Sequence, residues 1–478
     1  MLFNSHIFML LFLPLLLAGW YFLNWKKKFQ LAQGYLIGMS LWFYAYANLQ
    51  YLWLLLFSCL IGWLLSCLPE KISSEKGKKV LTGVGCVFHL GLLGYFKYSN
   101  FFLENLNTVF HTDFPMLQIL LPVGISFYTF QQLAYLIDRC RGDAPRDSFF
   151  DYLTFMVYFP QLLQGPILLR SEFMEQLKEP ERRRFHAERF SEGIQFFVFG
   201  LAKKVLLADT LAKAVNYGYS NVSMLDSISA LLLAVGYLTE LYFDFSGYCD
   251  MAVGLGKMIG LEVAENFDAP FHSASVKEFW RRWHMTLGRF FTRYVYIPLG
   301  GSRKGLGRTI LNLFVVWALT GLWHGASWNF VLWGLYFFIF IALERLFLNK
   351  VFARLPGFVS HIYLLIVVYF GWILFRFKNM ALIGVVLKGM FCQNGNPWTT
   401  FEANTTLLNY IFFLAIAVIA VTPVVHNIGR AISVASGRSA AWFRVNSVVQ
   451  VAMPLVLLLI STMSLVGNSY NPFLYFQF

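Results

Sequence analysis

The sequence predicts an all-α polytopic integral membrane protein, a bundle of about 10–12 helices with re-entrant segments. Of its 478 residues, 58% are hydrophobic, and the mean hydropathy is +0.58. Many uncharged windows reach the roughly 18 residues that a helix needs to cross a bilayer. These apolar runs are continuous rather than alternating, which argues against a β-barrel.

Charge and cysteine usage limit the classes of partner. The formal net charge is +13 at neutral pH, and a membrane protein carries such charge mostly in its cytoplasmic loops. Because the basic residues are split among several loops, we expect no nucleic-acid partner. The six cysteines show no CxxC spacing, so neither a disulfide framework nor a zinc site is predicted.

The first helix sets the expected orientation. Met1 to Trp25 is apolar, and Lys26-Lys27-Lys28 follow it rather than precede it. A secretory signal peptide has the opposite polarity, so we interpret this stretch as a spanning helix with its N-terminus outside. Further spans are expected at roughly 30–48, 50–68, 80–97, 117–138, 193–211, 227–245, 310–324, 328–346, 358–374, 406–424 and 447–466.

The loops between these spans support that orientation. The expected cytoplasmic loops are basic, with lysines or arginines at 71–79, 139–146, 182–189, 345–354 and 430–444. Segment 149–170 is broken by two prolines and 244–308 is too polar to span, so we expect re-entrant or interfacial structure in both. With no internal repeat or soluble linker, we expect a single membrane domain over 1–478. Residues 468–478 would form an extracytoplasmic aromatic tail.

The best candidate for chemistry is His324, which ends an apolar run. An ionisable side chain in a bilayer helix costs free energy and by default marks a pathway or a reacting centre. Imidazole moves protons well near neutral pH, so we expect a general base. Trp323 and Trp328 would wall the ring, and Gly321 and Gly325 would allow close helix approach. The alternative is a structural histidine bonded to a neighbouring helix carbonyl.

A second candidate, His284, stands in the run Trp280-Arg281-Arg282-Trp283-His284. It is either a second polar group of the site or an interfacial anchor, because histidines among arginine and tryptophan suit a membrane surface. No third ligand stands at metal spacing, so a two-histidine metal site is not predicted.

The stretch around Tyr242 adds polar groups beside these histidines. Asp244 and Asp250 are six residues apart, and Ser246 lies between them. The carboxylates could orient a histidine or pair with Arg281 or Arg282. The alternative is helix capping together with salt bridges.

A basic patch with interleaved aromatic residues follows the same stretch. A donor that carries phosphates, such as coenzyme A, would be attracted to it. The alternative is ordinary positive-inside charge with contacts to anionic membrane lipid. The residues expected to bind the donor are Lys277, Arg281, Arg282, Arg289, Arg303 and Lys304.

Taken together and in order, these motifs resemble the membrane-bound O-acyltransferase family. The motifs are Trp280-Arg-Arg-Trp-His284-Met-Thr-Leu, Tyr242-Phe-Asp-Phe-Ser-Gly-Tyr and Trp323-His324-Gly325. The likeness is close over roughly 115–380 and looser at both ends. Within the family, the chain most resembles bacterial O-acetyltransferases of the alginate, cellulose and peptidoglycan systems. One departure is Glu240, where relatives often carry Gln.

The resemblance implies a bundle in which a funnel from each side meets near a central histidine. The family's invariant histidine would correspond to His324, and its second polar position to His284. Acetyl-CoA would be the donor substrate, with no bound cofactor, and the acceptor would lie outside the bacterial inner membrane. An extracytoplasmic partner protein with an SGNH-esterase-like fold would complete transfer to a polysaccharide.

The tail motivates a further hypothesis. Residues 473–478 read Phe-Leu-Tyr475-Phe-Gln-Phe and are placed outside by the expected topology. The Tyr475 hydroxyl could take the acetyl group and hand it on. The alternative is an aromatic belt that closes the last helix.

Two other function classes fit a polytopic protein with a buried histidine. A transporter or polymer-export channel usually shows related halves and charged residues in several helices, and neither feature is visible here. A non-catalytic scaffold for an acetylation complex would tolerate substitution of His324.

Overall fold

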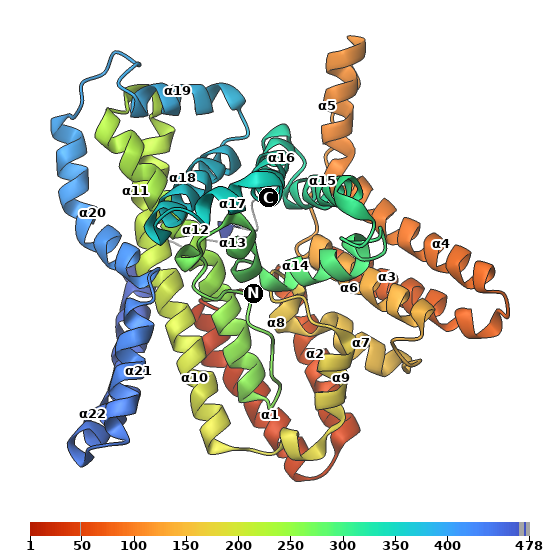
Figure 1. Ribbon diagram of the computed structural model, residues 1–478. Coiled ribbons are helices and arrows are strands. Elements are labelled where there is room, and N and C mark those ends of the chain that lie inside the picture. Colours follow the sequence, from red (N-terminus) through yellow and green to blue (C-terminus); the bar gives the residue numbers. More distant parts are fainter. Residues whose placement is uncertain (48, 468–472, 475–478) are drawn as a thin grey trace. The chain divides into compact units, whose positions relative to one another are not determined.

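The computed structural model describes residues 1–47, 49–467 and 473–474 (Figure 1). Helices dominate this part of the chain, and its only β pairing is an isolated bridge between Phe267 and Trp283. The predicted all-α fold is confirmed.

The described residues contain nine helices that are long and apolar enough to cross a membrane. The protein is therefore a multi-pass membrane protein, as predicted. The nine helices are Phe8–Trp25, Gln50–Lys71, Glu75–Phe110, Ser227–Met258, Gly305–His324, Trp328–Phe352, Gly357–Arg376, Phe401–Ala420 and Ala440–Gly467.

The chain divides into two compact units, which are described separately; that residues 1–478 form one domain remains a prediction. The first unit comprises Met1–Phe197, Cys249–Glu265 and Arg289–Val295. Phenylalanine rings pack at its core, among them those of Phe8, Phe43 and Phe159. Its helices are α1 (Leu13–Trp25), α2 (Phe29–Ala47), α3 (Gln50–Cys67), α4 (Glu75–Leu93), α5 (Ser99–Phe110), α6 (Ile125–Arg141), α7 (Phe149–Val157), α8 (Phe159–Leu162), α9 (Arg170–Lys178) and most of α10 (Ala187–Ala202).

The second unit comprises Val198–Tyr248, Asn266–Gly288 and Tyr296–Phe478. The longest helix, α12, and the short α14 each contribute residues to both units. The helices from here on are α11 (Asp209–Ser220), α12 (Ser227–Met258), α13 (Val276–Arg282), α14 (Met285–Phe291), α15 (Gly305–His324), α16 (Trp328–Leu343), α17 (Asn349–Phe352), α18 (Gly357–Arg376), α19 (Met380–Met390), α20 (Phe401–Ala420), α21 (Val424–Ser436) and α22 (Ala440–Gly467).

Helices α15 and α16 lie side by side in this second unit (Figure 1). A Cβ atom added to Gly321 would lie 2.4 Å from the carbonyl oxygen of Phe330, and one added to Gly334 would lie 2.4 Å from that of Trp317. The two backbones therefore approach closely only because both positions are glycine. The role predicted for Gly321 is confirmed.

Several helix boundaries differ from the sequence prediction, and two of them have a clear physical reason. The span expected at 227–245 runs on to Met258, since the following residues contain no proline and two of its glycines fit closely against neighbouring backbone. The span expected at 117–138 begins only at Ile125. Gly124, with φ of 77°, precedes it, and a Cβ there would lie 2.3 Å from the carbonyl oxygen of Leu162. The segment predicted to be broken is indeed split into the short α7 and α8.

Candidate active site

His284 lies at the break between α13 and α14. Its φ of 50° is in the left-handed region, so the chain turns sharply there. The side chain is only 2% exposed. The break thus directs an imidazole into the interior of the unit instead of leaving it at the surface.

Asn266 holds this break. Its side-chain oxygen accepts hydrogen bonds from the backbone N–H and the hydroxyl of Thr286, both at 3.0 Å. The same oxygen lies 3.3 Å from Nδ1 of His284. Because a backbone N–H can only donate, the atom facing it must be the amide oxygen and not the amide nitrogen. Nδ1 of His284 therefore carries the proton, and Nε2 carries the lone pair.

Burial also decides the charge of His284. Removal of water from the ring disfavours the imidazolium and lowers the pKa of His284 to about 3. The side chain is therefore neutral throughout the physiological range. A neutral imidazole with its proton fixed on Nδ1 can accept a proton or a hydrogen bond at Nε2.

His324 is the last residue of α15 and is 4% exposed. Three aromatic rings meet it edge to face: Trp333 at 4.9 Å, Trp323 at 5.0 Å and Phe375 at 5.4 Å between ring centroids. Such an enclosure keeps the local dielectric low and strengthens electrostatic interactions with a reacting group.

The two histidines share this enclosure. Their ring centroids are 6.5 Å apart, and Trp323 lies 5.7 Å from His284 and 5.0 Å from His324. The rings of Trp283 and Trp333 continue the cluster through Trp372. Two residues that are 40 positions apart in the sequence thus belong to one polar centre inside an aromatic cluster.

Three residues of this centre were not predicted from the sequence to belong to the site. Trp333 packs against the ring of His324. Trp328, which was expected to do so, is 54% exposed. Phe375 reaches the ring from α18, and its carbonyl accepts a hydrogen bond from Asn329 at 3.0 Å. Asn266 orients His284 through its side-chain oxygen. Only its short polar side chain hinted at this role, because sequence spacing does not relate residue 266 to residue 284.

The predicted donor-binding residues divide into two groups. Arg282 pairs with Glu278 at 2.9 Å, and Arg289 makes a two-pronged ion pair with Glu172. These two guanidinium groups are already engaged, so they are weaker candidates for phosphate binding. The remaining predicted residues, Lys277, Arg281, Arg303 and Lys304, have exposed side chains.

Asp244 does not pair with Arg281 or Arg282, contrary to one expectation. Its Oδ1 lies 2.6 Å from Nζ of Lys204, because α12 continues past this position and carries Asp244 into the packed interior. Ser246 on the same helix is fully buried, and Asp250 is partly exposed. Glu240 lies one turn before Asp244 and is 2% exposed.

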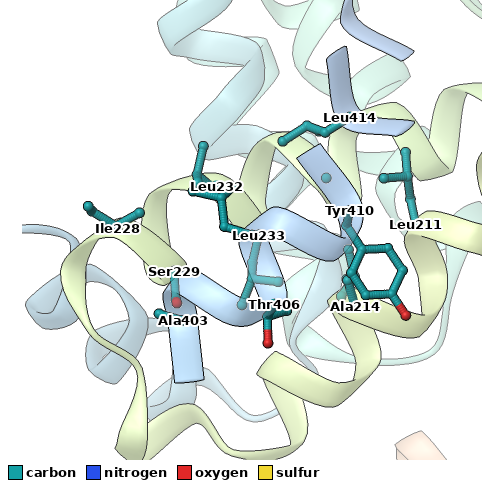
Figure 2. A pocket seen from close by; sticks show the side chains of 13 residues that line it. Leu211, Ala214, Ile228, Ser229, Leu232, Leu233, Ala403, Thr406, Tyr410 and Leu414 are labelled. Carbon is teal, nitrogen blue, oxygen red and sulfur yellow. The ribbon is translucent and has the colours of Figure 1, made fainter. Parts of the chain in front are cut away.

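Other features of the described residues add no reacting group. No cluster of three or more His, Cys, Asp or Glu side chains suited to a metal ion is found there. An apolar hollow of about 60 Å³ lies among α11, α12 and α20 (Figure 2). Its lining contains no charged or imidazole side chain. Tyr475 lies outside the described residues.

Comparison with known proteins gives a consistent result. Residues 143–387 match the model of MBOAT, the membrane-bound O-acyltransferase family. A "Peptidoglycan O-acetyltransferase" of Helicobacter pylori is 35% identical over 83% of this chain and 80% of its own. A "Probable alginate O-acetylase AlgI" of Pseudomonas putida is 36% identical over 100% of both chains. A "Teichoic acid D-alanyltransferase" of Bacillus subtilis is 26% identical over 53% of this chain and 67% of its own.

Proposed function

The chain belongs to the membrane-bound O-acyltransferase family and is an acyltransferase, and we propose that it transfers acetyl groups from cytoplasmic acetyl-CoA to an extracytoplasmic acceptor. The transfer would serve O-acetylation of an exported or cell-envelope polysaccharide, such as alginate, cellulose or peptidoglycan. The protein would act in the bacterial inner membrane with an SGNH-esterase-like partner protein. The relatives named for peptidoglycan and alginate support this substrate class.

The histidine pair inside its aromatic cluster is the observation that carries the proposal. The imidazole of His324 takes the proton of the acceptor hydroxyl, and the acceptor oxygen attacks the thioester carbonyl. The carbon–sulfur bond then breaks, and the proton goes to the departing thiolate. The products are an acetate ester and the coenzyme A thiol. A general base contributes about 10²–10⁴-fold to such a step.

His284 has a different proposed role. Because its proton is held at Nδ1 by Asn266, Nε2 offers a hydrogen-bond acceptor. It would accept a hydrogen bond from a second polar hydrogen of the bound substrates, such as a neighbouring hydroxyl or an amide N–H, and so hold the reacting hydroxyl beside the base. Such positioning raises the rate because the reacting groups lose less freedom in the transition state.

The exposed basic residues Lys277, Arg281, Arg303 and Lys304 would attract the phosphates of the donor. Arg282 and Arg289 would instead fix the local structure through their ion pairs. Asp244 and Ser246 belong to the buried face of α12 and would support the centre without touching the donor, and Asp250 would do so from the same helix.

The Tyr475 relay remains a second proposal within this function. Its phenol would take the acetyl group from the thioester and pass it to the final acceptor, with His324 accepting the phenolic proton. Full acetylation by Tyr475→Phe would exclude the relay and leave the aromatic-belt interpretation.

The test uses purified protein in lipid vesicles and acetyl-CoA labelled in the acetyl group. Loss of thioester and appearance of label on protein or acceptor are followed for wild type, His324→Ala and a control, His186→Ala, which removes an exposed histidine. We expect turnover in wild type and the control, and none above background in His324→Ala. Equal turnover in all three would show that His324 is not the base and would make His284 the next candidate, whereas no turnover in any of them would favour a scaffold.

A further inference from the structure

A charged cluster that the proposed chemistry does not use lies in the second unit. Nζ of Lys204 is 2.6 Å from Oδ1 of Asp244 and 2.7 Å from Oδ1 of Asp209. Lys204 and Asp244 are almost completely buried, at 1% and 2% exposure. We refer to Lys204, Asp209 and Asp244 as the ion triad. Buried ions of this kind need close partners, because their removal from water costs several kcal/mol each.

Two closely packed helices lie next to the ion triad. A Cβ atom on Gly247 of α12 would lie 2.7 Å from the carbonyl oxygen of Gly200 on α10, so these backbones are in direct contact. Lys204 follows Gly200 by one turn, whereas Asp244 precedes Gly247. The two helices therefore run antiparallel here, and the contact between Lys204 and Asp244 continues the same seam.

Two residues of the C-terminal tail contact the ion triad. The backbone N–H of Leu474 donates a hydrogen bond of 2.9 Å to Oδ2 of Asp244, and Nζ of Lys204 lies 4.5 Å from the ring centroid of Phe473. Tyr248 meets the same ring edge to face at 5.1 Å. The Phe473 side chain has no exposed surface.

Each contact uses a different property of the ion triad. Oδ2 of Asp244 is a carboxylate oxygen, which favours a backbone N–H donor. The ammonium group of Lys204 also lies over an aromatic ring, and such a cation–π contact gains strength when water is excluded. An aromatic residue followed by a free backbone N–H matches both features, which is what residues 473–474 supply.

We infer that the ion triad is an internal receptor for the C-terminal tail. By fixing residues 473–474, it holds the part of the tail that directly precedes Tyr475, the residue of the proposed acetyl relay. Asp244 also adjoins Phe245, whose ring lies 4.7 Å from that of His284, so one helix carries both the receptor and a wall of the candidate active site. The positioning half of this inference rests on the proposed function. The anchoring half does not.

Anchoring is tested by the accessibility of position 474 in the full-length protein. Leu474→Cys keeps the backbone N–H, and Cys392→Ser removes the exposed native thiol. The rate of labelling by a soluble maleimide is measured against a Cys392→Ser parent. We expect Phe473→Ala to raise the rate roughly tenfold, as loss of a desolvated cation–π contact implies. An unchanged rate would overturn the receptor.

Variants on the triad side separate anchoring from folding. Lys204→Arg keeps a cation that can contact both a carboxylate and a ring, so we expect slow labelling to persist. Lys204→Met should speed labelling, whereas Lys388→Met, which removes an exposed lysine of α19, should not. If Lys204→Met does not fold, Phe473→Ala and Lys204→Arg still decide the question, because neither leaves both carboxylates without a cation.

Positioning is tested by acetyl transfer in the same variants. Phe473→Ala should lower kcat at least several-fold and leave KM for acetyl-CoA unchanged, because the residues proposed to bind the donor are exposed lysines and arginines and do not include Phe473. Faster labelling with unchanged kcat would overturn the positioning half. If wild type shows no transfer at all, the proposed function fails, while the labelling rates still decide the anchoring half.

Discussion

The histidine pair and the ion triad are both buried in the second unit, yet their surroundings differ in kind. Lys204 lies between two carboxylates at 2.6 and 2.7 Å, whereas His324 lies among the edges of three aromatic rings. Mutual pairing satisfies the charges of the ion triad, which suits a fixed structural role. An imidazole in an aromatic enclosure suits proton transfer. The neighbours of a buried polar group, and not its burial alone, therefore indicate chemistry.

The largest effect expected from this contrast is on turnover. His324→Ala should lower acetyl transfer by about 10²–10⁴-fold, the usual contribution of a general base. The measurement is kcat together with a melting curve in detergent.

His89 provides a matched control for that substitution. This histidine is also buried, at 1% exposure, but its Nδ1 lies 3.3 Å from the Ser58 hydroxyl, which accepts a hydrogen bond from Gln132. His89→Ala should cost about 1–3 kcal/mol of stability by disrupting this network and should leave the kcat of folded protein intact. A loss of kcat in His89→Ala together with a normal kcat in His324→Ala would contradict the assignment of His324 as the reacting histidine and His89 as a structural one.

The second effect concerns the stability supplied by the ion triad. Lys204→Met should lower the free energy of unfolding by about 3–5 kcal/mol, because two carboxylates remain buried without a cation. Adding Asp244→Asn and Asp209→Asn to Lys204→Met should restore a large part of this loss. Equal melting temperatures for wild type and Lys204→Met would show that the ion triad does not stabilise the fold.

The third effect concerns the pH dependence of stability. The pKa of His284 is lowered to about 3 in the folded protein, whereas an unfolded histidine titrates near pH ~6.5. Between these values the unfolded chain binds the extra proton, so stability falls as the pH decreases, by about 1.4 kcal/mol per unit from this group. Above about pH 6.5 the contribution is constant.

His284→Gln should remove this part of the slope. The measurement is the midpoint of unfolding at a series of pH values between about 4 and 7, the range in which only the unfolded histidine gains a proton. A slope that is the same in His284→Gln and wild type would mean that other groups account for the whole acid sensitivity.

The smallest effect is expected at the basic residues. Arg281→Ala should raise KM for acetyl-CoA only a few-fold, about 1 kcal/mol or less, because a single exposed charge is well screened. Arg289→Ala should affect stability rather than KM, since its guanidinium pairs with Glu172. An Arg289→Ala variant with normal stability and a much higher KM would reverse this assignment.

The sequence predicted the fold class and both histidines of the candidate site, and physical reasons explain what it missed. Long apolar runs predict spanning helices. An imidazole within such a run costs free energy, which indicates a functional site. In contrast, Asn266, Trp333 and Phe375 reach the site through packing between distant segments, which spacing along the chain does not encode. The partner of Asp244 was missed for the same reason, because Lys204 lies 40 residues earlier.

The left-handed backbone at His284 has a consequence for tolerance to substitution. A residue with a Cβ atom costs roughly 1–2 kcal/mol in this conformation, and glycine costs almost nothing. Of all replacements at position 284, glycine should therefore yield the most abundant membrane protein and yet lack the imidazole. In a library of variants at position 284, the ranking by expression level should therefore differ from the ranking by acetylation activity. Such a difference is expected where a residue that is unfavourable for stability is retained for activity.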